Sequence, residues 1–252
     1  TDRSIMNVRD ILDFAESVKL EDIEELLQCQ IDYNMAIAEA GIKGDWGANI
    51  GSVLMEVWGD DVKVRAKALA AAGSDARMSG CDLPVVIASG SGNQGITASV
   101  PVIEYAKELG SDKETLLRAL VVSNLVTIHQ KTGIGRLSAY CGAVSAGCGA
   151  GAGIAWLHGG RFEEVAHTIV NALATVSGII CDGAKPSCAA KIAASVEAGI
   201  LGFHMFEKGQ QFYGGDGIVS KGVENTINNI GRLGREGMRE TDKEIIRIML
   251  ED

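Results

Sequence analysis

Cys181 and Cys188 flank a short turn, "CDGAKPSC", with six residues between them. Cys141 lies in another segment rich in small and polar residues, "GRLSAYCGAVSAGC". Three thiolates that converge from separate helix ends can hold an iron–sulfur cluster in which one iron lacks a protein ligand. Zinc with an open fourth position is the nearest chemical alternative, and three buried core thiols are the structural one. Spacing alone leaves all three interpretations open.

The other cysteines give weaker signals. Cys29 stands among apolar residues of an expected helix and is assigned to the core. Cys148 follows Cys141 by two helical turns, so it lies on the same helix face, either beside the site or as a packing residue. Cys81 is in a loop and stays undecided. Six cysteines among 252 residues are too few for a disulfide scaffold, which predicts a reduced, cytoplasmic protein.

Two more polar segments stand at expected helix boundaries: "AAGSDARMSGCDLP" (71–84) and "ASGSGNQGI" (88–96). Unpaired N–H groups at a helix N-terminus attract carboxylates and other anions. The string "SGSGNQG", directly before the helical pattern "ITASVPVIEYAKELG", suits such a role. It lacks the Lys-Ser/Thr ending of a nucleotide-binding P-loop. A plain flexible connection is the alternative.

The elements that must position these segments are helices. Residues 21–40 and about 60–72 repeat apolar residues at helical spacing, and Ser111 with Glu114 forms a capping-box pattern at the start of a further helix. Residues 83–89, "LPVVIAS", are the one candidate strand, with a buried helical turn as the alternative. We therefore expect an all-α fold: a single Gly/Ala-rich helical domain over residues 1–252, with at most a short buried strand.

One stretch departs from an ordinary helix. Residues 140–155, "YCGAVSAGCGAGAGIA", include five glycines, although each glycine costs about 1 kcal/mol relative to alanine inside a helix. Close approach of neighbouring helices explains such a run. Close approach of the backbone to a ligand or cluster explains it equally well.

Bulk composition excludes several functions. The net charge of −10 argues against nucleic-acid binding. No apolar run reaches the roughly 18–20 residues that cross a bilayer, so no membrane association is expected. The first residue is Thr1, not Met, which suggests a processed chain or a fragment.

Three strings carry a resemblance to a known family: "SDARMSGCDLPVVIASGSGNQGI", "GRLSAYCGAVSAGCGAGAGIAWL" and "IICDGAKPSCAAKI". From about Ile31 to Asp252 the chain resembles the carboxy-terminal region of the L-cysteine desulfidase family. It is more distantly similar to the alpha chain of iron–sulfur L-serine dehydratases. The resemblance implies an oxygen-sensitive [4Fe–4S] cluster held by Cys141, Cys181 and Cys188, and no pyridoxal phosphate. It also implies that "ASGSGNQG" holds the substrate carboxylate.

The chain departs from these families in two ways. It has no "GCTEP"-like string, which belongs to the amino-terminal domain of desulfidases. With Thr1 at the start, we expect the carboxy-terminal part of a longer protein, completed by an amino-terminal domain or a partner chain, and a homodimer is a further expectation. Acidic residues flank the first cysteine in the dehydratase motif, whereas Tyr140 and Gly142 do so here, so serine specificity does not follow.

The implied activity is elimination of sulfide and ammonia from L-cysteine to give pyruvate. L-serine dehydration and a non-catalytic scaffold or ligand-binding domain are the alternatives. A zinc-dependent lyase or hydrolase is disfavoured because the four histidines show no paired ligand spacing. Lys131 is the first candidate for the base that removes the α-proton, followed by Asp75 and His129. The substrate-binding candidates are Ser89, Ser91, Asn93, Gln94, Arg77 and Arg136, where each arginine has an ion pair with Asp75 or Asp182 as its alternative role.

Overall fold

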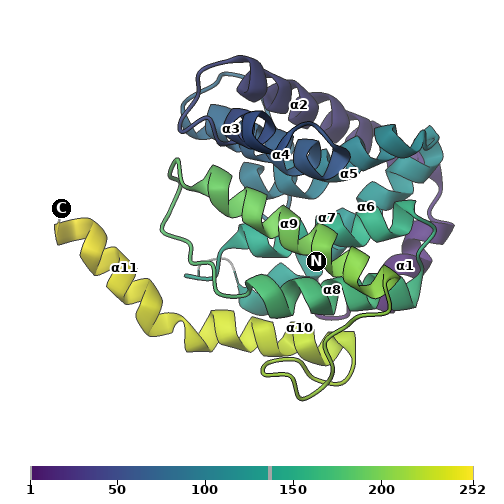
Figure 1. Ribbon diagram of the computed structural model, residues 1–252. Helices are drawn as coiled ribbons and strands as arrows, with labels where there is room; N and C mark the ends of the chain where they lie inside the picture. The colour runs from purple at the N-terminus through teal and green to yellow at the C-terminus, as the bar shows by residue number, and fades with distance from the viewer. Residues whose placement is uncertain (1, 136–137, 252) are drawn as a thin grey trace.

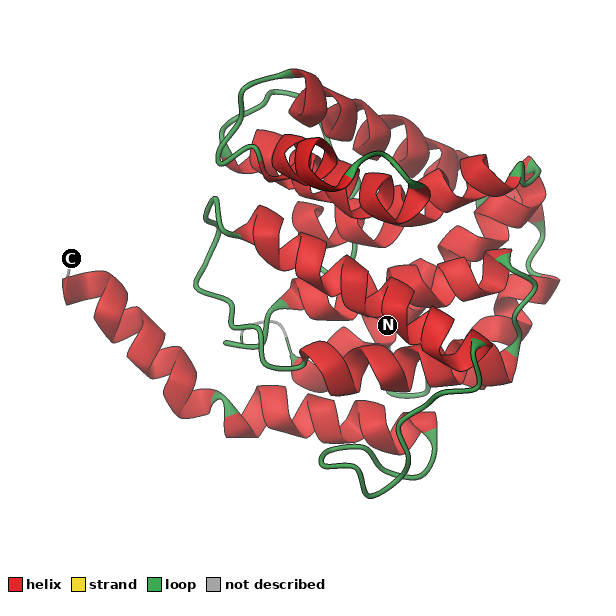
Figure 2. Cartoon of the chain, viewed as in Figure 1, coloured by secondary structure: helices red, strands yellow, loops and turns green. Residues whose placement is uncertain are grey.

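The computed structural model describes residues 2–135 and 138–251. These residues form eleven α-helices and no β-strand, so the expected all-α class is confirmed (Figures 1 and 2). A 3-10 turn, Leu20–Asp22, precedes α2, and a π-helical turn, Leu233–Gly237, precedes α11. The helices are α1 (Val8–Ser17), α2 (Glu24–Lys43), α3 (Ile50–Trp58), α4 (Val62–Met78), α5 (Gly92–Leu109), α6 (Lys113–Ile134), α7 (Gly142–Leu157), α8 (Phe162–Val176), α9 (Cys188–Glu207), α10 (Val223–Arg232) and α11 (Arg239–Glu251).

Helix α7 is the centre of the molecule. Every residue from Gly142 to Trp156 is buried, and α5, α6, α8 and α9 pack around it (Figure 1). A helix without a polar face must be covered on all sides. The small residues of "GAVSAGCGAGAGIA" therefore become the axis on which the other helices pack.

The glycines of α7 let its neighbours approach closely. A Cβ at Gly147 would lie 2.4 Å from the backbone of Ser195, and one at Gly151 would lie 2.6 Å from the carbonyl oxygen of Gly199. Side chains at these positions would force α9 away. Close helix packing thus accounts for this part of the glycine run.

The same contacts fix the direction of the helices. Later residues of α7 contact later residues of α5 and of α9, so these three helices run parallel. Helix α6 runs the opposite way, since Gly149 meets Thr127 while Gly153 meets Ala119. Helix α4 runs opposite to α9, because Lys67 pairs with Glu197 while Ala71 packs near Ala189. The N-termini of α5, α7 and α9 therefore lie at the same end as the C-termini of α4 and α6.

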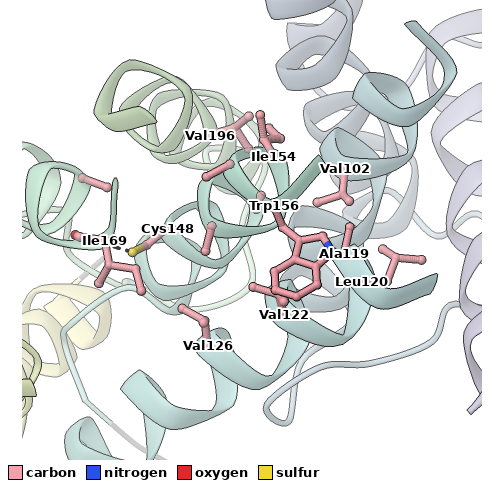
Figure 3. Close-up of a cluster of buried hydrophobic side chains, with 14 of the residues drawn as sticks. Val102, Ala119, Leu120, Val122, Val126, Cys148, Ile154, Trp156, Ile169 and Val196 are labelled. Atoms are coloured by element: carbon pink, nitrogen blue, oxygen red, sulfur yellow. Dashed lines mark hydrogen bonds between the residues drawn. The ribbon is translucent and has the colours of Figure 1, made fainter. Parts of the chain in front are cut away.

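Cys148 belongs to the hydrophobic core. It is fully buried, and its thiol donates to the carbonyl oxygen of Ile169 at 3.7 Å (Figure 3). Val102, Val126 and Val196, from α5, α6 and α9, belong to the same hydrophobic cluster as Cys148. Of the two roles left open for Cys148, packing is the one that the structure supports.

Two local expectations were wrong. Asp112, not Ser111, caps α6: its carboxylate accepts a hydrogen bond from the backbone N–H of Thr115 at 2.8 Å. The segment 83–89 is neither a strand nor a helix. It is a loop with one isolated bridge, between Ala88 and Ser91. The side chain of Asn34 is hydrogen-bonded to both the N–H and the carbonyl of Val86, so these groups are not available to pair with a neighbouring strand.

Helix α11 extends away from the other helices (Figure 1) and has no buried residue. Among the described residues, no helix is long and apolar enough to cross a membrane.

Candidate active site

Backbone pairing joins the first two cysteine segments. The N–H of Cys141 donates to the carbonyl of Ile179 at 3.1 Å, and the N–H of Cys181 donates to the carbonyl of Ala139 at 2.6 Å. These bonds form an isolated antiparallel bridge between Tyr140 and Ile180. Residues 40 positions apart are thereby held side by side at the N-terminus of α7.

The sulfurs of these segments interact. The Cys141 thiol, the backbone N–H of Gly183 and the positive charges of Lys131 and Lys191 lower the pKa of the Cys181 thiol. The Cys181 thiol, burial and the charge of Cys188 raise the pKa of Cys141. All three cysteines named from the sequence are therefore neighbours.

The turn between Cys181 and Cys188 is fixed by an ion pair and a glycine. Asp182 accepts from the ammonium group of Lys191, which holds the pKa of that carboxyl below its ordinary value. Gly183 adopts a φ of +93°, which favours glycine. The thiol of Cys188 lies 3.5 Å from the carbonyl oxygen of Gly183. Lys191 was absent from the sequence-based candidates, since only the fold brings α9 back to Asp182.

Lys131 lies in the last turn of α6, half-buried beside these thiols. Burial lowers the pKa of Lys131, against the opposing influence of Cys181 and Cys141. The antiparallel course of α6 against α7 puts this ammonium group at the N-terminal end of α7. Of the three candidate bases, Lys131 is the one that the fold brings to the cysteines.

The start of α5 reaches the same place, whereas Ser89, earlier in the preceding loop, lines a cleft with Leu27 of α2 and Leu125 of α6. Ser89 has a φ of +54°, a rare conformation for a residue with a side chain, and Ser91 precedes the first turn of α5. The amide of Gln94 lies against Gly142: a Cβ there would be 2.4 Å from Nε2 of Gln94. The predicted carboxylate loop and the first cysteine are therefore in adjacent helix turns.

Arg77, in the last turn of α4, meets this loop. Its Nη1 donates to Oδ1 of Asn93 at 3.2 Å. In the part of the chain that the structure describes, Arg77 forms no ion pair with Asp75 or with Asp182. Neither of the two ion pairs considered as its alternative role is therefore present. Arg136 lies outside the described residues.

Asp75 has a structural role in this arrangement. Its buried carboxylate accepts hydrogen bonds from the backbone N–H groups of Ile50 at 2.8 Å and Ala48 at 3.3 Å, at the start of α3. Burial raises its pKa, and these N–H groups oppose the rise. The carboxylate is thus occupied with the backbone at the start of α3.

His129 faces away from the cysteines. Its Nε2 lies 2.8 Å from Oε2 of Glu224 on α10, and Oε1 of Glu224 accepts from the backbone N–H of Val8 at 2.7 Å. Burial raises the pKa of Glu224, but the hydrogen bonds from His129 and Val8 outweigh it, so the net shift is downward. This contact joins α6, α10 and α1.

Buried polar atoms without partners gather near the cysteines. Within the described residues, four such side chains belong to the helix ends that meet here: Ser74, Gln94, Gln130 and Ser145. A buried polar group without a hydrogen bond costs about 1–3 kcal/mol. Tyr105, His167 and Gln211 also have such atoms, in other parts of the described chain, so polar groups that a ligand could satisfy are present at this end of the bundle but are not confined to it. The sequence-based candidates included only Gln94 of these.

Across the described residues, no group of three or more His, Cys, Asp or Glu is arranged around one metal-ion position. The site combines three thiols, which are soft metal ligands, with two lysines and three helix N-termini, which add positive potential.

The chain is an all-α protein in which cysteines and a Gly/Ser/Asn loop meet at converging helix ends. The model of the serine dehydratase alpha chain family matches residues 4–247. The chain belongs to this family, as its distant similarity to the dehydratase alpha chain predicted.

The curated relatives have similar sequences but longer chains. A UPF0597 protein of Desulfitobacterium hafniense is 70% identical over 250 residues, which are 99% of this chain and 58% of that protein. UPF0597 proteins of Lachnoclostridium phytofermentans and Treponema denticola are 57% and 50% identical over 99% and 100% of this chain, and over 60% of their own lengths. The chain thus spans about three fifths of the relatives it matches. No solved structure gives a significant match.

Proposed function

We propose that this protein is an iron–sulfur-dependent lyase that eliminates sulfide and ammonia from L-cysteine to give pyruvate, with L-serine as the alternative substrate. The observation that carries the proposal is the meeting of Cys141, Cys181 and Cys188 with Lys131 at the N-termini of α5, α7 and α9. Membership in the serine dehydratase alpha chain family supports the lyase class. The choice of cysteine over serine rests on the resemblance of the sequence strings to desulfidases.

Cys141, Cys181 and Cys188 would hold a [4Fe–4S] cluster, and no pyridoxal phosphate is needed. When bound, the cluster supplies a Lewis-acidic iron with an open position. The chain's own contribution is to hold the three thiols together and to favour the thiolate of Cys181. Lys191 and the helix N-termini supply the positive potential for this.

Lys131 is the proposed base because it is the candidate beside the thiols. Its neutral amine takes the α-proton of the substrate onto Nζ, and the electron pair of the Cα–H bond forms the Cα=Cβ double bond. The bond from Cβ to the leaving group breaks with its electron pair on sulfur or oxygen, which departs as hydrosulfide or hydroxide and leaves 2-aminoacrylate. Water then converts its imine tautomer into pyruvate and ammonia. Asp75 and His129 are less favoured as the base, because their hydrogen bonds hold them at the starts of α3 and α10.

The loop from Ser89 to Gln94 would bind the substrate carboxylate. The first N–H groups of α5 have no partner within the helix, and the positive end of the helix dipole attracts an anion. Ser89, Ser91, Asn93 and Gln94 supply polar side chains at this point. Arg77 supports this loop through its hydrogen bond to Asn93, and Arg136 stays a proposed contributor.

The whole protein's assembly is also a proposal. Because the relatives are longer, an additional domain or a partner chain would complete the enzyme, and a homodimer is compatible with this arrangement. A cytoplasmic location suits an oxygen-sensitive cluster. The competing proposal is a non-catalytic helical scaffold or ligand-binding domain of a split enzyme.

Anaerobic reconstitution with iron and sulfide tests the proposal. We expect about four irons per chain, followed by pyruvate release from L-cysteine that exceeds release from L-serine. The relative from Desulfitobacterium hafniense, assayed in parallel, shows whether the additional part of that longer chain is required. Iron binding without pyruvate release in either protein would favour the scaffold. Zinc retained in place of iron would favour the zinc alternative.

A further inference from the structure

Arg77 is a cation without an acidic partner among the residues that the structure describes. Its guanidinium is half-buried, and its one hydrogen bond there goes to Oδ1 of Asn93 at 3.2 Å. Asp75 is taken by the backbone of α3, and Asp182 by Lys191. The contact with Asn93 is therefore the interaction that remains to explain the arginine.

The packing around Arg77 leaves space for its contact with Asn93. A Cβ on Gly92 would lie 2.4 Å from Nε of Arg77 and 2.6 Å from Cγ2 of Val85. Only a residue without a side chain at position 92 leaves room for the guanidinium at the start of α5. The C-terminal turn of α4 favours a cation, whereas the N-terminus of α5, which carries partial positive charge, disfavours one. Charge pairing with α5 therefore does not account for the position of the guanidinium beside it.

Hydrogen-bond chemistry fixes the orientation of the Asn93 amide. A guanidinium has five N–H donors and no acceptor, so the amide must turn its oxygen toward Arg77. Nδ2, with its two N–H groups, is then the free end of the side chain. A free NH₂ group beside the unpaired N–H groups of α5 is a donor set for a carboxylate.

We infer that Arg77 is a positioning residue that acts through Asn93: it orients the amide so that Nδ2 donates to the carboxylate of an α-amino acid. Asn93, not the charge of Arg77, is the group that contacts the ligand. This inference rests on the proposed function for the identity of the ligand as a small amino acid. It assigns separate roles to two residues that the sequence grouped together.

A double-mutant cycle on ligand binding tests the inference. The probe is L-alanine, which has the carboxylate and ammonium of an α-amino acid but no β-leaving group, and binding is followed by ligand-observed NMR titration. We expect Arg77→Ala and Asn93→Ala each to weaken binding roughly 10- to 100-fold. The double variant should be no weaker than Asn93→Ala alone. Multiplied losses in the double variant would mean that Arg77 contacts the carboxylate independently.

Asn93→Asp separates donation by Nδ2 from packing. Aspartate has the shape of asparagine and still accepts from Arg77, but it lacks the Nδ2 donor, so binding of L-alanine should weaken at least as much as in Asn93→Ala. Binding within about threefold of wild type would overturn the inference. Arg65→Ala, on the same helix as Arg77, is the matched control, because Arg65 pairs with Glu104 and Glu108 at the other end of α4. Circular dichroism on each variant confirms folding, and the isosteric Asn93→Asp keeps the inference testable if Arg77→Ala unfolds.

Failure of the inference can be told from failure of the proposed function. L-alanine binding requires neither turnover nor pyruvate formation. An enzyme that releases pyruvate but shows an additive cycle would overturn the inference alone. A protein that shows the non-additive cycle but no iron binding and no pyruvate would keep the inference as amino-acid recognition and overturn the lyase. Wild-type protein that binds no L-alanine would overturn the inference.

Discussion

Gln94 lies flat against Gly142, so that a Cβ on the glycine would lie 2.4 Å from Nε2 and 2.5 Å from Cδ of the glutamine. This contact joins the first turn of α5 to the first turn of α7. Because Gly142 directly follows Cys141, it also sets the distance between the carboxylate loop and the cysteines. The sequence places these two residues 48 positions apart.

Gly142→Ala should disturb this contact. The added methyl group must displace the Gln94 amide, which has little free space because it is buried, so we expect a loss of about 1–3 kcal/mol in the free energy of unfolding. Chemical denaturation measures the change. Gly178→Ala is the matched control, since no atom lies within 4 Å of its Cβ position. A loss of similar size at both positions would contradict a specific Gln94–Gly142 contact.

Cys181→Ser should remove the cluster. A serine hydroxyl is a poor iron ligand, so we expect the reconstituted variant to retain little of the roughly four irons per chain. Cys29→Ser, in the half-buried middle of α2, should load iron like wild type. Iron analysis on both soluble variants gives the answer. Equal iron in Cys181→Ser and wild type would contradict the assigned ligand set.

Lys191→Gln should weaken the turn that carries two of the cysteines. The substitution removes the ion pair with Asp182, and loss of such a supporting contact typically costs 10- to 100-fold in metal affinity. Iron release to a chelator, followed over time, measures the effect. Lys185→Gln, in the same turn, is the matched control because no ion pair of Lys185 occurs among the described contacts. Equal release rates in both variants would leave Lys191 without this role.

Lys131→Gln should lower turnover, whereas His129→Gln should lower stability. Loss of a general base typically reduces the rate by a factor of about 10²–10⁴, so pyruvate release should fall by that range at unchanged iron content. In His129→Gln the contact with Glu224 is weakened, and pyruvate release should stay within about threefold of wild type. Parallel assays of pyruvate, iron and unfolding distinguish the two. A large loss of turnover in His129→Gln alone would reverse the assignment.

Glu224 should make stability depend on acid pH. Its pKa in the folded protein lies below its ordinary value, so its contribution is present above about pH 4.5 and is lost as the pH falls through the folded pKa. Because the side chain is 37% exposed, we expect only about 1 kcal/mol after solvent screening. The difference in unfolding free energy between wild type and Glu224→Gln should shrink as the pH falls from 6 to about 3.5. Glu56→Gln, on the exposed side of α3, should show no such trend.

Much of the local structure could be predicted from the sequence. Apolar residues at three- and four-residue spacing predicted α2 and α4, because burial of one face stabilises a helix wherever the chain continues. The unusual density of small residues indicated either close helix packing or close approach to a ligand, and the contacts at Gly147 and Gly151 show close packing. Local cues were less reliable at boundaries: Ser111 and Asp112 both suit a cap, and only the fold selected the carboxylate of Asp112.

The candidate site could be predicted only in part. Residue type indicated Cys141, Cys181, Cys188 and Lys131, since thiols and amines carry chemistry that few other side chains offer. Residue type also indicated Asp75 and His129, yet these are held by the backbone of α3 and by Glu224. A one-dimensional pattern cannot tell an available side chain from one that has a distant partner.

The sequence by itself determined which segments become helices and which residue types can bind metal or move a proton, because these properties depend on neighbours along the chain. The tertiary structure decided that α5, α7 and α9 run parallel, so that their N-termini meet the ends of α4 and α6. It also decided that Arg77 faces Asn93 and that Asp182 faces Lys191. Those contacts follow from the close packing of helices far apart in sequence, which no local pattern records.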